Sequence, residues 1–427
     1  MGTQFCKVKH SCHIQINGVY EPRFWYYYFS MTKSDSIQTA VDPVRATEIR
    51  HRNIMAVLSA IYASRNKGGA SQTDIVNRIG LKAPSVFRIF TYLEQNGYIV
   101  QCQDPKAIPE SRKGRHPVYY TVRPDALYTI GIDFWSSCLS LGVFDFNRHR
   151  IYSHMETLDD TVDATKIEDL ICTLTQKAIS ELGIPDEKIA GIGIAAPGKV
   201  NVATGSIVYY PRISGMENYP LKEAVEKRLG YRVLVHNNCS ALAYSVYRYG
   251  DKDPGKSMFA FLVRGGVNGA MVSENGIYTA ADGTSLEAGH IPVNFDGPKC
   301  SCGLKGCLQA YMLELDAGLN NGSSNSVLFA SITDINDSKA DAVLEKAAFY
   351  MFTSMKTIQR ALSPDSFLII CPSIFVAETI ASKIRKLYKS SEDYFQNRKP
   401  SVFAMAYDNV LAQAGASDLV LDEFFGS

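Results

Sequence analysis

Between residues 286 and 307 the chain reads Leu286-Glu-Ala-Gly-His-Ile-Pro-Val-Asn-Phe-Asp-Gly-Pro-Lys-Cys-Ser-Cys-Gly-Leu-Lys-Gly-Cys307, which places one histidine and three cysteines within eighteen residues. One imidazole nitrogen and three thiolates are the ligand set that tetrahedral Zn²⁺ prefers. Because four protein ligands leave no open position for a reactive water, the spacing predicts a structural zinc site. The predicted ligands are His290, Cys300, Cys302 and Cys307.

Glycines stand at the turns between the sulfurs. Gly303 and Gly306 allow the positive φ angles that a tight knuckle needs. The alternative is a chance cluster in a chain with ten cysteines. The other cysteines have no paired spacing, as is usual for reduced thiols in the cytoplasm. They are Cys6, Cys12, Cys102, Cys138, Cys172, Cys239 and Cys371.

The motif Glu287-Ala-Gly-His290, followed by Cys-x-Cys-Gly-x-x-Gly-Cys, resembles the signature of the ROK family of bacterial sugar kinases and sugar-responsive transcriptional repressors. The resemblance includes residues 190–198, 218–233 and 413–420, and it covers about residues 125–427. It implies an α/β, two-lobed, actin-like (ribonuclease-H-like) ATPase-type body that holds a sugar between its lobes.

Charge divides the chain into a basic and an acidic part. Residues 31–124 contain 14 Lys and Arg against 7 Asp and Glu, whereas residues 125–427 contain 27 against 35. This asymmetry indicates that the first part meets a polyanion. We expect a poorly ordered or over-annotated N-terminal extension at 1–46, with translation starting at Met31 as one explanation. A DNA-binding domain at 47–124 and a sugar-binding body at 125–427 would follow.

Residues 47–100 predict three helices and the start of a wing. Ile49, Ile54, Val57, Leu58 and Ile61 form one apolar stripe at helical spacing. Ser71-Gln-Thr-Asp74 is a capping signal for a second helix that ends at Gly80, and Pro84 starts a third. Such a pair of helices is typical of a helix-turn-helix. Residues 98–101 and 118–122 are β-rich and predict the hairpin of an α+β winged helix.

The third helix and the wing tip supply the candidate DNA contacts. Arg88 is the candidate for a guanine edge, and its alternative role is that of an ordinary solvated arginine. An extended Arg115 can insert into a narrow minor groove of DNA, and Lys82 is placed to contact a phosphate of the DNA backbone. The predicted DNA-binding residues are Lys82, Ser85, Phe87, Arg88, Thr91, Arg112, Lys113 and Arg115. This DNA-binding domain, called the head below, also resembles the DNA-binding domain of ROK repressors.

The sequence of the body differs from that of ROK kinases at the segments that would bind the nucleotide and at the position of the catalytic general base. The family's phosphate loop Asp-x-Gly-Gly-Thr is here Asp133-Phe-Trp-Ser-Ser137, and a Gly-Gly pair is replaced by Cys371-Pro372-Ser373. A second phosphate segment survives in part, as Arg264-Gly-Gly-Val-Asn-Gly269. Asn238 replaces the aspartate that would take the sugar proton. The sequence therefore predicts no catalytic residue and no kinase activity.

The remaining cleft residues fit sugar binding. The predicted sugar contacts are Asn237, Asn238, Glu287 and His290, whose second ring nitrogen is free for a hydroxyl when the first binds zinc. The alternative for Asn237 and Asn238 is that they only cap the following helix. The segment Arg212-Ile-Ser-Gly-Met216 lacks both hallmark residues of the family's Asn-x-x-Gly-Trp loop, so the sugar can be unusual, modified or absent.

Residues 250–257, Gly250-Asp-Lys-Asp-Pro-Gly-Lys-Ser257, match the P-loop pattern. A P-loop leaves a strand and opens a helix. Here a predicted helix precedes the segment and a predicted strand follows it, so the sequence favours a surface turn.

These observations predict a cytoplasmic, sugar-responsive DNA-binding transcriptional regulator, most simply a repressor of carbohydrate-uptake or catabolic genes. Its partners would be double-stranded operator DNA, a sugar or sugar-phosphate effector and a second copy in a homodimer or dimer of dimers. No apolar run is long enough for a membrane span. The alternatives are an ATP-dependent sugar kinase with an accessory DNA-binding head and a DNA-binding protein controlled by a protein partner.

Overall fold

The computed structural model describes residues 46–103, 117–320, 322, 327–333, 338–391 and 399–426. The chain forms two compact units, residues 1–49 and 50–427, and the contacts given below lie within the second. The predicted N-terminal extension therefore lies outside the described residues, apart from Ala46, where α1 begins. The domain boundaries proposed from the sequence stay predictions.

The helices are α1 (Ala46–Tyr62), α2 (Gln72–Ile79), α3 (Ala83–Gln95), α4 (Ala164–Leu182), α5 (Leu221–Leu229), α6 (Asn238–Tyr249), α7 (Leu308–Leu319), α8 (Ser338–Leu362), α9 (Ile374–Ser390) and α10 (Asn409–Phe425). The strands are β1 (Ala70–Ser71), β2 (Ile99–Cys102), β3 (Tyr119–Val122), β4 (Tyr128–Trp135), β5 (Cys138–Asp145), β6 (Arg150–Thr157), β7 (Ile189–Ala196), β8 (Lys199–Asn201), β9 (Ser206–Tyr209), β10 (Val233–Asn237), β11 (Ser257–Val263), β12 (Val267–Ser273), β13 (Gly276–Ile277), β14 (Ser366–Cys371) and β15 (Ser401–Ala406).

The predicted helix-turn-helix forms as expected. Ser71 Oγ accepts from the Asp74 amide at 3.2 Å, and the Asp74 carboxylate accepts from the Ser71 amide at 2.9 Å, so the capping box that starts α2 is complete. Strands β2 and β3 pair antiparallel, from Ile99 opposite Val122 to Cys102 opposite Tyr119, which confirms the predicted hairpin. The apolar stripe of α1 begins later than predicted, because Ile49 is 48% exposed whereas Ile54 is buried.

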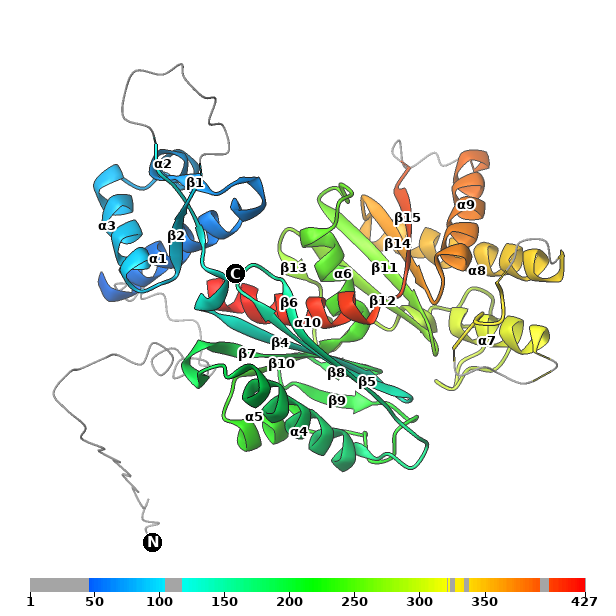
Figure 1. Ribbon diagram of the computed structural model, residues 1–427. Helices are drawn as coiled ribbons and strands as arrows, with labels where there is room; N and C mark the ends of the chain where they lie inside the picture. Colours follow the sequence, from blue (N-terminus) through cyan, green and yellow to red (C-terminus); the bar gives the residue numbers. More distant parts are fainter. Residues whose placement is uncertain are drawn as a thin grey trace, which may run out of the picture. The chain divides into compact units, whose positions relative to one another are not determined.

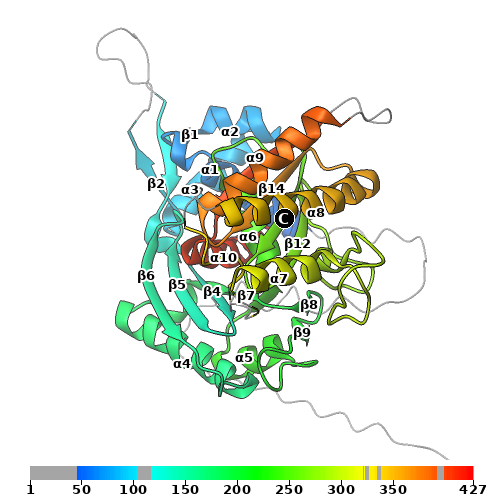
Figure 2. The same cartoon turned by 90° about the vertical axis from the view of Figure 1, so that its right-hand side faces the viewer.

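Two five-stranded sheets form the body. The first has the order β10-β7-β4-β5-β6, and the second has the order β13-β12-β11-β14-β15. Apolar side chains of α4 and α5 pack on the first sheet, and those of α8 and α9 pack on the second. Figure 2 shows the ribbons of α4 and α5 beside the first sheet and those of α8 and α9 beside the second. Each sheet therefore has its own core, and a third apolar cluster lies between the sheets.

Helix α10 packs against the first sheet and against α6, and Figure 1 shows it in red. Two glycines make this contact possible. A Cβ on Gly131 would lie 1.9 Å from the Gln413 carbonyl oxygen, and one on Gly193 would lie 1.9 Å from that of Ala416. Both approaches are closer than any side chain allows, so the glycines Gly131 of β4 and Gly193 of β7 permit the close approach of the α10 backbone.

Within the described residues, no helix is both long enough and apolar enough to cross a bilayer.

Candidate metal centre, cleft and DNA-contacting residues

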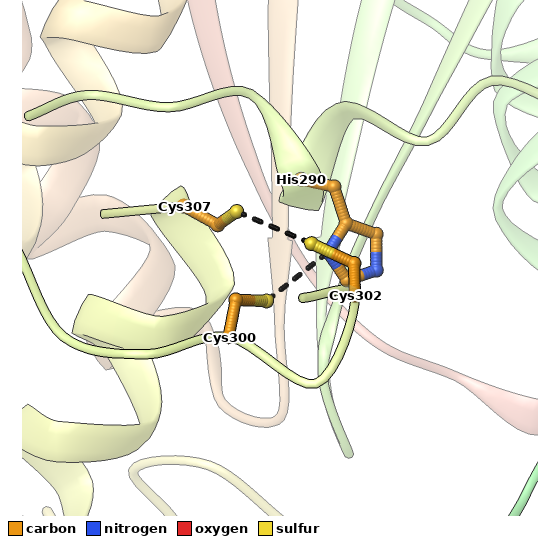
Figure 3. A group of neighbouring side chains, drawn as sticks. All are labelled: His290, Cys300, Cys302 and Cys307. Carbon is orange, nitrogen blue, oxygen red and sulfur yellow. Dashed lines mark hydrogen bonds between the residues drawn. The ribbon is translucent and has the colours of Figure 1, made fainter. Parts of the chain in front are cut away.

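The four predicted metal ligands come together. The ligand atoms of His290, Cys300, Cys302 and Cys307 all lie within 4.8 Å of one another. His290 Nδ1 is 3.3 Å from Cys300 Sγ, and Cys302 Sγ is 3.6 Å from Cys307 Sγ, as Figure 3 shows. Ligands around a tetrahedral zinc with bonds of about 2.0 to 2.3 Å stand roughly 3.5 to 3.8 Å apart. The cluster can therefore hold a metal ion of that size.

The local backbone explains how three sulfurs reach one point. Gly303 and Gly306 have φ angles of 92° and 70°, which are the left-handed values predicted for the turns. A Cβ on Gly306 would lie 1.5 Å from the Asn294 carbonyl oxygen, so this position accepts only glycine. Cys307 directly precedes α7. The Leu308 amide at the start of this helix donates to the Ile291 carbonyl at 3.0 Å, which joins the helix to the segment that carries His290.

His290 joins the cluster to the predicted sugar site. Its Nδ1 faces the sulfurs, and its Nε2 lies 3.7 Å from Glu287 Oε2. Burial raises the pKa of the half-buried Glu287 carboxyl, and the Lys199 ammonium opposes this shift. A carboxylate and a ring nitrogen on one short segment can accept and donate to neighbouring hydroxyl groups.

The two asparagines of the predicted site differ in their surroundings. Asn237 caps α6: its Oδ1 accepts from the Cys239 amide at 2.9 Å, and its Nδ2 donates to the Gly198 carbonyl at 2.7 Å. The capping role that the sequence left open for Asn237 is therefore present. Asn238 is also buried, and among the described residues no partner hydrogen-bonds to its Oδ1. Asn238 is the better placed of the two to bind a ligand hydroxyl.

The predicted DNA-contacting residues of the third helix lie on one exposed surface. Lys82, Ser85 and Arg88 are exposed, and Phe87 is 59% exposed. Thr91 is half-buried, and its hydroxyl donates to the Phe87 carbonyl at 3.1 Å. The opposite face of α3 is buried, with Phe90 edge-on to Tyr120 of β3 at 5.2 Å. The other predicted contacts, Arg112, Lys113 and Arg115, lie outside the described residues.

The P-loop pattern at Gly250–Ser257 is a turn between α6 and β11, as predicted. Two of its amides are already occupied, because Lys256 and Ser257 donate their backbone N–H groups to the Asp365 carboxylate at 2.9 and 3.2 Å. The segment neither leaves a strand nor opens a helix, which a phosphate cradle requires.

Sequence reasoning missed a buried polar group at the two segments that resemble phosphate loops. Asp133 lies in β4, which turns directly into β5, and Arg264 directly follows β11. Arg264 Nη1 is 3.5 Å from Asp133 Oδ2, and the Tyr407 hydroxyl also donates to that carboxylate oxygen. The only sequence signal was Trp135, which stands where the family's phosphate loop has a glycine.

Two sheets of this topology, with α6 and α10 between them, define an actin-like (ribonuclease-H-like) body. The same chain also carries the helix-turn-helix. A family model described as "ROK family" matches residues 129–423, and the chain belongs to the ROK family.

Three similar proteins are informative. The xylose repressor of Caldicellulosiruptor bescii is 26% identical over 63% of this chain, and the match spans 65% of the repressor's own length. The glucokinase of Streptomyces coelicolor is 30% identical over 43% of this chain and 55% of the enzyme. A crystal structure of a ROK family transcriptional regulator, a homologue of the E. coli MLC protein, superposes with a TM-score of 0.68 at 18% identity and covers 89% of this chain and all of that one.

Proposed function

We propose that this protein is a sugar-responsive DNA-binding transcriptional repressor without kinase activity. The observation that carries the proposal is the exposed surface of α3, where Lys82, Ser85, Phe87 and Arg88 project from a helix-turn-helix on the same chain as a ROK body. The similarity to repressors named for xylose supports a sugar as the effector and operator DNA as the partner. A repressor of this kind works in the cytoplasm.

The metal cluster is proposed to bind one structural Zn²⁺ through His290, Cys300, Cys302 and Cys307. The soft donor set and the separations of its atoms support zinc over Mg²⁺ or Ca²⁺, which prefer oxygen. Bound zinc would fix the ring of His290 and, through it, the position of Glu287. The sugar contacts proposed beside it are Asn237, Asn238, Glu287 and His290.

Operator recognition requires two heads. One winged helix reads too few base pairs for useful specificity, so we propose a homodimer, or a dimer of dimers, on a pseudo-palindromic site. Half-sites would be spaced by about 34 to 36 Å or a multiple of that distance. Fluorescence anisotropy with an operator obtained by in vitro selection, repeated across a sugar panel that includes D-xylose, tests this function.

Replacing Arg88 by alanine is expected to reduce discrimination at one base pair in each half-site by about 1 to 3 kcal/mol, because a bidentate contact to guanine would be lost. The measurement compares the affinities of the variant for the selected operator and for operators with single base-pair changes. Arg52→Ala removes the same charge from an exposed position of α1 and serves as the control. Equal discrimination by Arg88→Ala and the wild type would exclude a base contact.

A second candidate function is an ATP-dependent sugar kinase with an accessory DNA-binding head, which the similarity to glucokinases favours. We expect neither the wild type nor Asn238→Asp to phosphorylate a monosaccharide. Loss of a general base costs about 10²- to 10⁴-fold, but restoring it leaves Trp135 and Arg264 in the nucleotide segments. A coupled assay with Mg-ATP and a sugar panel measures this, with an active ROK glucokinase run in parallel. Clear phosphorylation by the wild type would overturn the assignment.

A further inference from the structure

Three side chains from both sheets of the body meet in one buried polar group. Asp133 belongs to β4 of the first sheet, whereas Arg264 and Tyr407 directly follow β11 and β15 of the second. Asp133 is 1% exposed and Arg264 is 5% exposed. Their charges are 3.5 Å apart, and the Tyr407 hydroxyl donates to the same carboxylate. The ion pair therefore bridges the two halves of the body away from water.

Aromatic rings from both halves hold the same guanidinium group. The Arg264 Cζ atom lies 4.7 Å from the ring centroid of Trp135 in β4 and 4.3 Å from that of Tyr407. Both distances allow a cation–π attraction, which is stronger for a desolvated cation than for an exposed one. Arg264 is thus bound to the first half by Asp133 and Trp135 and to the second by its own backbone and Tyr407.

The segments that meet here are those that resemble the phosphate-binding loops of ROK kinases. In a kinase, such loops approach a nucleotide from two sides with small residues. Here Asp133 and Trp135 of one segment contact Arg264 of the other directly. The chain's own guanidinium and indole groups take up the space where these segments face each other.

Residues next to Arg264 also contact the segment of the proposed sugar site. Val267 packs so tightly on Gly289 that a Cβ there would lie 2.0 Å from the Val267 carbonyl oxygen. On the other side, the Arg212 guanidinium donates to the Gly265 carbonyl. The turn that carries Arg264 therefore lies against the Glu287–His290 segment and against the Arg212 loop.

We propose that Asp133, Arg264 and Tyr407 form a latch that holds the two halves of the body together without a nucleotide, and that sugar bound beside Glu287 is sensed at this latch. The second part of the proposal rests on the proposed sugar-binding function. The turn that carries Arg264 lies against the Glu287–His290 segment, so a sugar bound there can shift Arg264 relative to Asp133.

A double-mutant cycle tests the latch without any ligand. Arg264→Met and Asp133→Asn are each expected to lower the Tm by at least about 5 °C, because each leaves a buried charge without its partner. The double variant should lose clearly less than the sum of the two losses. Arg228→Met, at an exposed arginine paired with Glu168 and Asp169, is the control and should shift the Tm by less than about 2 °C. Additive losses would overturn the latch. If a charge variant does not fold, Tyr407→Phe replaces it in a cycle with the other charge variant.

Trp135 reports on the latch directly. The chain has two tryptophans, Trp25 and Trp135, so Trp25→Phe leaves Trp135 as the only indole. Mg-ATP at millimolar concentration should change neither the Trp135 emission nor the Tm, and a rise in Tm would contradict the proposal.

The same single-tryptophan protein is then titrated with the sugar panel, with binding measured separately by calorimetry. A sugar that binds should change the Trp135 emission, and the change should be lost in Arg264→Met. Binding without any change would overturn sensing at the latch. If no sugar binds, the proposed sugar response fails, and the double-mutant cycle still decides whether the latch exists.

Discussion

Replacing Cys302 by serine is expected to destabilise the body by several kcal/mol, a part of the roughly 10 to 16 kcal/mol with which structural sites bind zinc. The four ligand atoms lie within 4.8 Å of one another, and without a metal only the weak hydrogen bonds His290–Cys300 and Cys302–Cys307 offset the crowding of three thiol groups and an imidazole. Thermal unfolding of the variant and of chelator-treated wild type measures the effect. The variant should also weaken the sugar response, since His290 lies between the metal and Glu287.

The control for this experiment is Cys102→Ser, at a half-exposed cysteine of β2 outside the cluster, which should change stability little. Elemental analysis should find one zinc per chain in the purified wild type. Folded protein that contains no metal would refute the structural role of the cluster.

Replacing Glu287 by alanine is expected to leave operator affinity intact and to abolish its dependence on sugar. A ligand shifts an equilibrium only by its differential affinity for two states, and typical couplings of 1 to 3 kcal/mol correspond to about 5- to 150-fold in affinity. Removing the carboxylate removes the proposed sugar contact but no residue of the proposed DNA-contacting surface. Operator binding by anisotropy, with and without each sugar of the panel, measures both quantities.

Glu274→Ala, at an exposed glutamate in the turn after β12, is the matched control and should keep the full response. If no sugar changes the operator affinity of the wild type, control by a protein partner becomes the better account. If Glu287→Ala still responds, the sugar binds elsewhere.

The features predicted well from the sequence are those encoded over short distances. The capping box of Ser71 and Asp74 and the cluster at residues 290–307 depend on neighbours in the chain, so spacing alone predicts them. The ROK body was predicted from motifs, because its glycines and small residues mark close backbone contacts such as that of Gly193 with α10.

The latch could not be predicted in the same way. Tyr407 and Asp133 are 274 residues apart, and the sequence around Asp133 does not indicate which hydroxyl or cation its carboxylate contacts. The segment that begins at Arg264 was interpreted as a surviving part of a phosphate loop, since its glycines were present. Only the folded chain reveals that the arginine turns toward Asp133. For Asn237, the sequence allowed both a cap and a ligand contact, and the structure contains the cap.

The close fit of α10 has a consequence for the order in which the body is made. This helix comes after every strand of both sheets in the chain, yet residues such as Ala412 and Ala416 fill the space beside Gly131, Gly193 and α6. During synthesis, the apolar surfaces of the two sheets that face α10 therefore stay uncovered until α10 has left the ribosome. We expect the nascent body to be prone to aggregation during this interval, since exposed apolar surface favours it.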